Sequence, residues 1–484
     1  MKALHAILSA VILSGIVSGS ENPNILFIYL DDFGWKDTSY MGSDFFETPH
    51  IDKLAREGMI FTNAYSGAAN CAPARACLLS GQYSPRHEIY NVGTGPRGKS
   101  AHRKLKYIPG VSTLREDIVT WAQCLQKANY ETATMGKWHL SSNPLPYGFD
   151  LNVGGTHSGG PPNGYYPPHG KAPNLRDVPE SEYVTDTLSH RACDFIRENK
   201  DRHWALYLTH FAVHTPIQGK KELLPKYRAK TPGTQHNNVE MATMIQAVDD
   251  GVGLIVAELE KQGLRKNTVI LFYSDNGGYG PATDMAPLKG YKGTYYEGGI
   301  RVPFFVNWPG QVSPGESCDT PVTGVDMYPT LCEIAGATLP AGQPLDGKSL
   351  VPVVTGKDAT ELADRAIFWH FPAYLQSYAR TDQQRDPLFR SRPCSVVRKG
   401  DWKLHEYFED GGFELYNLAN DIGETNNLAG AEPEKLQELQ QELITWRNTI
   451  NAPVPTEKNP AYDAEAEKAA LTAPGKRNKN RKKG

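Results

Sequence analysis

Four apolar, β-prone stretches each end abruptly in polar or charged residues, and this feature most constrains the fold of the chain. The stretches are NILFIYLDD (24–32), ETATMGKWH (131–139), HWALYLTHFAVHTP (203–216) and NTVILFYSDNGG (267–278). Runs without polar alternation are typical of parallel strands that are buried on both faces. Because ligands of such sheets collect beyond the carboxyl ends of the strands, we expect the polar endings to share one site.

Helical patterns lie between these stretches. Apolar residues recur every three or four positions from Met241 to Leu259, and a shorter pattern of the same kind runs from Leu188 to Ile196. Strands that alternate with helices predict an α/β fold, with a doubly wound, mostly parallel sheet flanked by helices.

The pattern changes after about residue 365. The segment 402–418 alternates apolar and polar residues around Gly411 and Gly412, which indicates a hairpin, and 431–449 has a helical apolar face. We therefore divide the chain into a signal peptide (1–19), a main domain (20–365), a C-terminal α+β subdomain with an antiparallel sheet and a helix (366–455), and a basic, disordered tail (456–484).

The N-terminus and the overall charge bear on location and partners. Lys2, an apolar run over 6–17 and Val17-Ser18-Gly19 form the pattern of a cleaved leader. We expect an exported protein, periplasmic or extracellular, without a membrane anchor. With 51 basic and 54 acidic residues the chain is no polycation, so nucleic acid is not an expected partner.

The stretch NCAPARACLLSG (70–81) contains the most unusual cysteine. Pro73 suits the first turn of a helix, so Cys71 is expected at a helix N-terminus, where backbone N–H groups favour an anion. Arg75 adds a permanent charge with planar donors suited to an oxyanion. The alternative is a packed cysteine beside a surface arginine. The chain has seven cysteines, so in an oxidising compartment at least one lacks a disulfide partner or is chemically altered.

Two of the strand ends supply oxygen ligands. Asp31 and Asp32 follow one stretch, and Asp275 and Asn276 follow another. Calcium prefers such oxygen donors, whereas zinc favours histidine or cysteine. Each pair alone is also common in turns. Together, at neighbouring strand ends, the four residues predict a metal site.

Basic residues end the other two stretches, and a further lysine lies in a glycine-rich segment. Lys137 and His139 lie in GKWH, His214 in AVHTP, and Lys292 in the glycine-rich segment LKGYKGTYYEGGIRVP. Each alone is more often a surface cation or a satisfied histidine than a catalytic group.

The motif C-x-P-x-R followed by LLSG resembles the signature of the type I sulfatases of the alkaline phosphatase superfamily, and the resemblance extends from NILFIYLDD to ELYNL. Alanine stands at position 74, where the family commonly has serine. The resemblance implies that a formylglycine-generating maturation enzyme oxidises Cys71 to formylglycine, whose hydrated aldehyde is the nucleophile. It also implies that Asp31, Asp32, Asp275 and Asn276, with the modified Cys71, bind one calcium ion.

The same resemblance assigns roles to the basic residues. Arg75, Lys137, His139 and Lys292 would contact the sulfate or the hydrated aldehyde, and His214 and Lys292 would assist departure of the alcohol. The expected activity is hydrolysis of sulfate esters on a sulfated polysaccharide or oligosaccharide.

Two alternatives remain. One is a phosphatase or phosphonate hydrolase of the same superfamily, although those enzymes generally carry a histidine where this chain has Asn276. The other is a relative that binds sulfated glycans without catalysis. A basic loop over 84–107 either lines the pocket and contacts a polyanionic substrate, or is simply solvated. This loop contains Arg86, Arg97, Lys99, His102, Arg103, Lys104 and Lys106.

Overall fold

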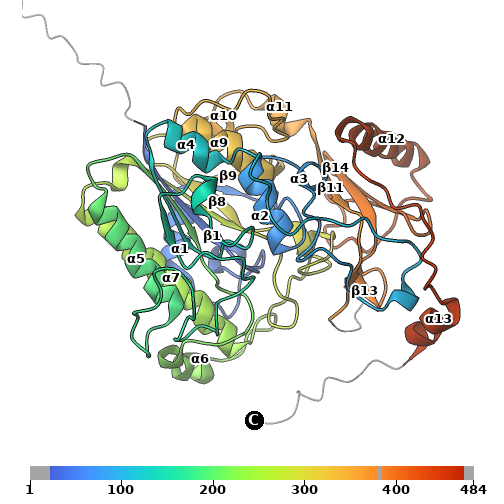
Figure 1. The fold of residues 1–484 in the computed structure, drawn as a ribbon, viewed down its shortest axis with the longest axis horizontal. Coiled ribbons are helices and arrows are strands. Elements are labelled where there is room, and N and C mark those ends of the chain that lie inside the picture. Colours follow the sequence, from blue (N-terminus) through green and yellow to red (C-terminus); the bar gives the residue numbers. More distant parts are fainter. Residues whose placement is uncertain (1–21, 379–382, 474–484) are drawn as a thin grey trace, which may run out of the picture.

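A computed structural model describes residues 22–378 and 383–473 (Figure 1). The predicted leader (1–19) and the last eleven residues of the chain lie outside the described residues. Within the described ranges, no helix combines the length and the apolar character needed to cross a membrane.

The four predicted stretches form neighbouring strands of the main sheet, which has eight strands in the described part of the chain. Their order is β5 (Leu151–Val153), β4 (Glu131–Gly136), β6 (Trp204–Thr209), β1 (Asn24–Leu30), β7 (Thr268–Ser274), β8 (Phe304–Asn307), β2 (Met59–Phe61) and β9 (Glu316–Cys318). All adjacent pairs from β5 to β7 are parallel, and β8 runs antiparallel to both β7 and β2. The predicted mostly parallel sheet is confirmed.

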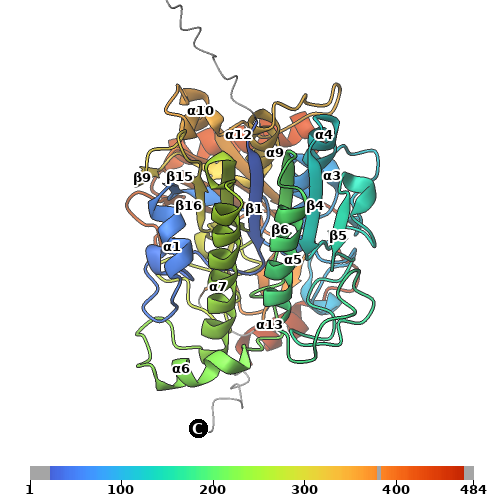
Figure 2. The same ribbon diagram turned by 90° about the vertical axis from the view of Figure 1, so that its left-hand side faces the viewer.

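Helices cover both faces of this sheet. One face carries α1 (Pro49–Arg56), α5 (Val184–Glu198), α6 (Leu224–Ala229) and α7 (Val239–Lys261), and Figure 2 shows α5 and α7 in front of the strands. The other face carries α2 (Cys71–Ser80), α4 (Trp121–Lys127), α9 (Met327–Ile334) and α10 (Val351–Val354).

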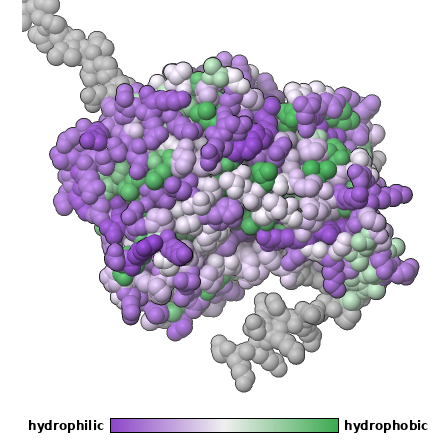
Figure 3. Space-filling view, in the orientation of Figure 1, coloured by the Kyte–Doolittle hydropathy of each residue, from purple (hydrophilic) through white to green (hydrophobic). Residues whose placement is uncertain are grey.

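Alternate residues of each strand belong to opposite sides of the core. In β1, Leu26 and Ile28 pack with the first helical layer, whereas Phe27 and Tyr29 pack with the second. Both faces are therefore buried, which explains the lack of polar alternation in the sequence. On the face that Figure 3 displays, hydrophobic residues form small separate groups among polar ones.

The C-terminal part forms a second, antiparallel sheet, as predicted. Its strands are β11 (Ala366–Phe371), β14 (Cys394–Lys399), β15 (Trp402–Tyr407) and β16 (Phe413–Asn417), and α12 (Pro433–Ile450) packs on them. The β15–β16 hairpin turns at Gly411, whose φ of 65° favours glycine. A small pair, β12 (Leu375–Gln376) and β13 (Phe389–Ser391), lies between the two bodies of the fold.

The remaining elements are short. They are β3 (Ala64–Tyr65) and β10 (Val322–Thr323), which pair with each other, and the one-turn helices α3 (Ser84–His87), α8 (Glu297–Ile300) and α11 (Thr360–Ala363).

The predicted disordered tail is wrong for residues 456–473. These residues pack on the basic loop and end in a helix, α13 (Ala464–Thr472), which begins after the N-cap residue Asp463. The buried Glu467 of α13 pairs with Arg392 at 2.8 Å, and Lys106 pairs with Glu457 at 2.6 Å. Charge composition alone missed this segment because its order depends on ion pairs to distant residues.

Candidate active site

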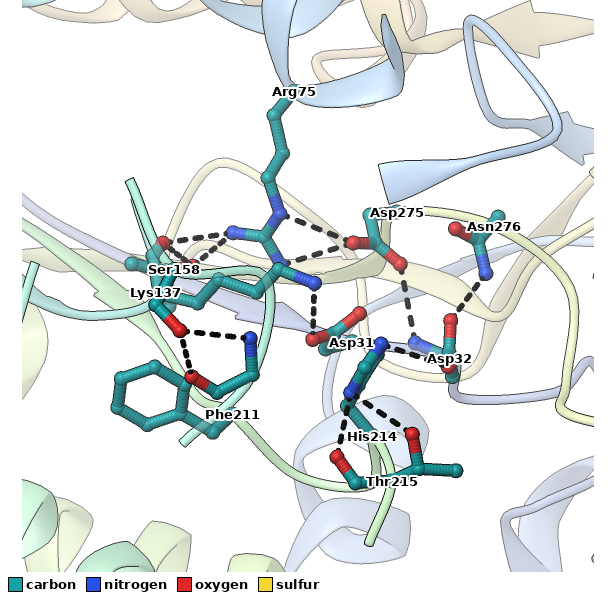
Figure 4. A network of polar contacts seen from close by, with 12 residues as sticks. Asp31, Asp32, Arg75, Lys137, Ser158, Phe211, His214, Thr215, Asp275 and Asn276 are labelled. Carbon is teal, nitrogen blue, oxygen red and sulfur yellow. Dashed lines mark hydrogen bonds and ion pairs between the residues drawn. The ribbon is translucent and has the colours of Figure 1, made fainter. Parts of the chain in front are cut away.

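The polar strand ends meet at one edge of the main sheet, as the parallel arrangement requires (Figure 4). Asp31 and Asp32 follow β1, and Asp275 and Asn276 follow the adjacent β7. Lys137 follows β4, on the other side of β6, which lies next to β1. The sheet thus brings together residues that are up to about 245 positions apart in the sequence.

Three carboxylates form a compact buried cluster. One oxygen from each of Asp31, Asp32 and Asp275 lies within 4.8 Å of the others. Asn276 Nδ2 donates a hydrogen bond to Asp32 Oδ1 at 2.8 Å, and the Asp32 backbone N–H donates to Asp275 Oδ1 at 3.1 Å. Such a cluster is unfavourable unless cations neutralise it.

Each carboxylate has its own basic partner. Lys137 Nζ lies 2.6 Å from Asp31 Oδ2, and Lys292 Nζ lies 2.7 Å from Asp32 Oδ2. Arg75 Nε donates to Asp275 Oδ2 at 3.1 Å, and this arginine also bonds the Lys137 carbonyl and the Thr209 hydroxyl. Burial favours the neutral form of Asp31, but Lys137, His214 and Arg75 together outweigh burial and hold the pKa of this carboxyl below its usual value.

The oxygen donors suit a hard cation such as calcium. Within the described part of the chain, Asp31 Oδ1 and Asn276 Oδ1 are buried without a hydrogen-bond partner. Unsatisfied buried oxygens are costly, and a bound cation would satisfy them. The residues that the sequence singled out therefore fit a metal ion.

Cys71 is the first residue of α2, as the position of Pro73 predicted. Its side chain is buried, at the end of the helix where backbone N–H groups favour negative charge. Burial opposes ionisation of the thiol, but Lys137, Lys292 and the contacts with His139 and His214 together outweigh burial, so the pKa of Cys71 falls well below its usual value. The surroundings of Cys71 therefore favour an anionic group.

Two histidines lie within hydrogen-bonding reach of the Cys71 sulfur, His139 and His214. His214 Nδ1 lies 2.8 Å from the Thr215 carbonyl oxygen, so Nδ1–H donates a hydrogen bond to this carbonyl. The other ring nitrogen, Nε2, lies 3.8 Å from Asp32 Oδ2. Burial is the main reason that the pKa of His139 falls to about 4, and the Cys71 contact opposes this shift only in part. His139 is thus neutral near pH 7.

Two residues of the site have an unusual backbone conformation. Asp32 and His139 have φ values of 58° and 68°, in the left-handed region that side chains other than glycine seldom adopt. Such conformations persist where surrounding contacts fix them, and they cluster at functional sites.

Five of the ten predicted site residues line a cavity of about 290 Å³. Asp32, Cys71, His139, His214 and Lys292 line it. A larger cavity of about 630 Å³ beside β5 and α5 is lined by none of the predicted site residues.

Sequence reasoning missed several lining residues. They are Thr215, Tyr279, Leu375, Tyr378 and Arg390. Leu375, Tyr378 and Arg390 come from the segment around β12 and β13, and no motif in the sequence links that segment to the strand ends. The sequence shows two arginines in FRSRP (389–393), but nothing in it marks Arg390 as buried.

The expectation for the basic loop 84–107 holds for one of its seven basic residues. Arg97 lines the cavity, but Arg86 pairs with Asp346 at 2.9 Å and Lys106 pairs with Glu457 at 2.6 Å. The loop therefore contributes Asn91, Val92 and Arg97 to the pocket wall, whereas its other basic residues named above do not line the cavity. The loop 156–168 contributes Gly159 to the cavity.

Comparisons with known proteins agree with this geometry. Residues 23–337 match the family model "Sulfatase", and residues 291–449 match the model "N-sulphoglucosamine sulphohydrolase, C-terminal". A "Sulfatase" of Formosa agariphila is 33% identical, with 90% of each chain covered. The human N-acetylgalactosamine-6-sulfatase is 30% identical, over 74% of this chain and 70% of its own.

Solved structures show the same fold. The crystal structure of Ps i-CgsB in complex with k-i-k-neocarrahexaose has a TM-score of 0.72 and 29% sequence identity, and the match covers 93% of this chain and 97% of the other. A phosphonate monoester hydrolase of Agrobacterium radiobacter, at 19% identity and a TM-score of 0.64, shares the fold. The family models and the curated relatives support a sulfatase over a phosphatase or phosphonate hydrolase. The chain that carries Cys71 beside this carboxylate cluster belongs to the sulfatase family, whose members hydrolyse sulfate esters.

Proposed function

We propose that this chain hydrolyses sulfate esters of a sulfated polysaccharide or oligosaccharide, with formylglycine made from Cys71 and with one bound calcium ion. The observation that carries the proposal is the position of Cys71, at the N-terminus of α2 and within reach of Lys137, Lys292, His139 and His214. A structural cysteine would need none of these partners.

Asp31, Asp32, Asp275 and Asn276 would hold the calcium ion, together with the modified residue at position 71. Their oxygen donors and the two unsatisfied oxygen atoms support this assignment. When bound, the ion would neutralise the carboxylate cluster and attract the negative charge of the sulfate group.

Formylglycine, in its hydrated form, would supply a hydroxyl nucleophile that attacks sulfur. The basic side chains around position 71 would stabilise the negative charge that spreads over the sulfuryl oxygens. Lys137 and Lys292 are buried and already oriented by Asp31 and Asp32, so they need little rearrangement as charge develops. Arg75 is held by Asp275 and the Lys137 carbonyl, which keeps both neighbours in position.

The two histidines would move the protons. His214 has its Nδ1 fixed by the Thr215 carbonyl, so a protonated ring would donate from Nε2 to the leaving alcohol oxygen, with Lys292 beside it. His139 is neutral near pH 7 because burial lowers its pKa to about 4, so it can accept a proton from the group at position 71. Asp275 would help to activate the attacking hydroxyl.

The proposal also covers the substrate, the maturation partner and the location of the protein, which the family assignment does not specify. The k-i-k-neocarrahexaose bound to Ps i-CgsB and the name of the N-acetylgalactosamine-6-sulfatases support a sulfated carbohydrate as substrate. Oxidation of Cys71 would require a formylglycine-generating enzyme as a partner. The leader-like N-terminal sequence supports export to the periplasm or the medium.

The test is release of inorganic sulfate from sulfated oligosaccharides, measured by ion chromatography on protein from a host that matures sulfatases. We expect sulfate release by the wild-type protein and a loss of at least about 1,000-fold in Cys71→Ala, because the nucleophile is gone. A matched phosphate ester should be hydrolysed far more slowly. Sugar binding without sulfate release from any ester by fully matured protein would overturn the proposal in favour of a binding protein.

A further inference from the structure

The wall of the cavity opposite the strand ends is built by residues with no role in the proposed reaction. Arg390 lies on β13 and Tyr378 lies just after β12, whereas Arg97 comes from the basic loop. These three side chains share one cavity with Cys71 and Lys292. A molecule that fills the cavity therefore contacts both the reacting end and this wall.

Arg390 is a buried cation to which the described residues offer no acidic partner. Its side chain is only 4% exposed, and its guanidinium donates from Nε to the Gln376 carbonyl at 2.9 Å and from Nη1 to the Lys292 carbonyl at 3.0 Å. Both acceptors are neutral. No carboxylate among residues 22–378 and 383–473 pairs with Arg390, in contrast to the buried Arg75, which pairs with Asp275.

The orientation of Arg390 is fixed. The guanidinium carbon lies 3.6 Å from the centre of the Tyr378 ring, and this ring packs edge-on against Tyr279 at 5.2 Å. Stacking on an aromatic face holds the planar fork in one direction, as suits two-pronged recognition of an oxyanion. Tyr291 stacks on the same ring at 5.9 Å, and Tyr378 is 41% exposed.

Arg97 adds a second cation at the same place. Its backbone N–H is anchored to the Tyr374 carbonyl at 3.0 Å, and its Nη2 donates to the Val92 carbonyl at 3.1 Å. The part of the chain that the structure describes offers no carboxylate to Arg97 either. Burial lowers the pKa of Arg390, and the charge of Arg97 acts in the same direction, as expected for two neighbouring cations.

A buried guanidinium costs several kcal/mol of desolvation unless an anion compensates it. The carboxylate cluster does not supply that anion, because Asp31, Asp32 and Asp275 are paired with Lys137, Lys292 and Arg75. Among residues 22–378 and 383–473 no carboxylate compensates Arg390, and an acidic group of a bound molecule would do so.

We propose that Arg97 and Arg390 form a second anion-binding subsite, so that the substrate carries another acidic group beside the sulfate ester that is cleaved. That group is a sulfate or a carboxylate on the same sugar or the next one, since both present oxygen pairs that match the fork. The inference rests on the proposed sulfatase function and narrows its substrate class to carbohydrates with at least two anionic groups.

The experiment compares three matched disaccharides that share one cleavable sulfate: one is otherwise neutral, one carries a second sulfate, and one carries a uronic acid. The measured quantity is the ratio of kcat/KM for each doubly anionic sugar to that for the neutral one. We expect Arg97→Gln to lower this ratio by about 10- to 100-fold, as loss of a hydrogen bond between charged groups does.

The matched control is Lys99→Gln, which removes one positive charge from the same loop at a residue that does not line the cavity. It should leave the ratio unchanged. Arg390→Lys keeps the charge but loses the fork, and we expect it to lower the ratio as well. Because Arg390 also donates a hydrogen bond to the Lys292 carbonyl, the melting temperature of the Arg390→Lys protein is measured in parallel. If that variant unfolds, the test rests on the variant of the exposed Arg97.

The Arg97→Gln variant also identifies the second group. If only the ratio of kcat/KM for the doubly sulfated sugar falls, the group is a sulfate. If only the ratio for the uronic acid falls, it is a carboxylate, and if both fall, the subsite accepts either. A ratio unaffected by Arg97→Gln for both sugars would overturn the subsite while leaving the sulfatase function intact.

A binding measurement distinguishes failure of the anion-binding subsite from failure of the proposed sulfatase function. Calorimetry on the Cys71→Ser protein, with the same disaccharides, reports the subsite without any turnover. Binding that depends on Arg97, in a protein whose wild type releases no sulfate, would reject the proposed function and keep the subsite. Equal binding of singly and doubly anionic sugars would reject the subsite.

Discussion

Lys137 Nζ lies 2.6 Å from Asp31 Oδ2, and both side chains are fully buried beneath Cys71. In the proposed reaction this lysine stabilises charge on the sulfuryl oxygens. We therefore expect Lys137→Ala to lower kcat by about 10²- to 10³-fold, the range for loss of one transition-state donor. The control, Lys106→Ala, removes an exposed lysine paired with Glu457 and should keep kcat. Turnover near the wild-type value in Lys137→Ala would remove this residue from the site.

Calcium should stabilise the protein as well as support activity. Chelation with EGTA is expected to lower the melting temperature, and calcium at about 100 times its Kd should restore about 2.7 kcal/mol of stability. Asn276→Ala removes one of the unsatisfied oxygens and should weaken this response. Differential scanning calorimetry measures both effects.

The control for calcium is Asp250→Asn. Asp250 belongs to a separate group with His50 and Asp249 that also offers ligand atoms within 4.8 Å of one another. A calcium response that disappears in Asp250→Asn but survives in Asn276→Ala would move the metal site away from the sheet edge.

A buried ion network joins the main domain to the C-terminal sheet. Lys403 of β15 is fully buried and contacts Glu297 of α8 at 2.9 Å and Glu424 at 3.0 Å. Lys403→Met leaves two buried carboxylates without this cation, so we expect it to lower the free energy of unfolding by about 3–5 kcal/mol. Chemical denaturation measures the change.

The exposed pair Lys348–Glu361, at 2.9 Å, provides the comparison. Lys348→Met should change the free energy of unfolding by no more than about 1 kcal/mol. Similar effects of the two substitutions would show that burial does not control the strength of the network.

Buried histidines should make the protein sensitive to acid. Burial lowers the pKa of His370 to about 4, below its usual 6.5, so between these values the unfolded chain binds more protons than the folded one. Stability is therefore retained above pH 6.5 and is lost as pH falls toward 4. One such histidine contributes a slope of about 1.4 kcal/mol per pH unit in this window.

His370→Gln should reduce that slope, and an amide can replace both contacts of the neutral ring, with Ser395 Oγ at 2.8 Å and the Pro453 carbonyl at 2.9 Å. The exposed His190 is the control, and His190→Gln should leave the slope unchanged. Urea unfolding at several pH values measures this slope for the wild type and for both variants. An identical slope in wild type and His370→Gln would contradict the assignment.

The sheet and its polar edge were predictable because they depend on local pattern. An apolar run that ends in Asp31-Asp32 or Asp275-Asn276 shows both the strand and the direction of its ligand-bearing end. The start of α2 at Cys71 was predictable for the same reason, since Pro73 marks a first helical turn. Lys292 follows no strand, and only the family motif singled it out.

The residues that sequence reasoning missed depend on tertiary contacts. Arg390 reaches the cavity because β13 packs on the Lys292 loop, where Ser391 Oγ donates to the Gly293 carbonyl at 2.8 Å. No periodicity records a contact across 98 positions. The ordered segment that contains α13 was missed likewise, because Glu467 owes its buried position to Arg392.

The central claim is that Cys71 is converted into the nucleophile of a sulfatase. The most direct measurement is the mass of the tryptic peptide Glu57–Arg75, from protein made in a host with a formylglycine-generating enzyme. We expect the mass of formylglycine or its hydrate at position 71. An unmodified thiol in protein that nevertheless hydrolyses sulfate esters at full rate would contradict it.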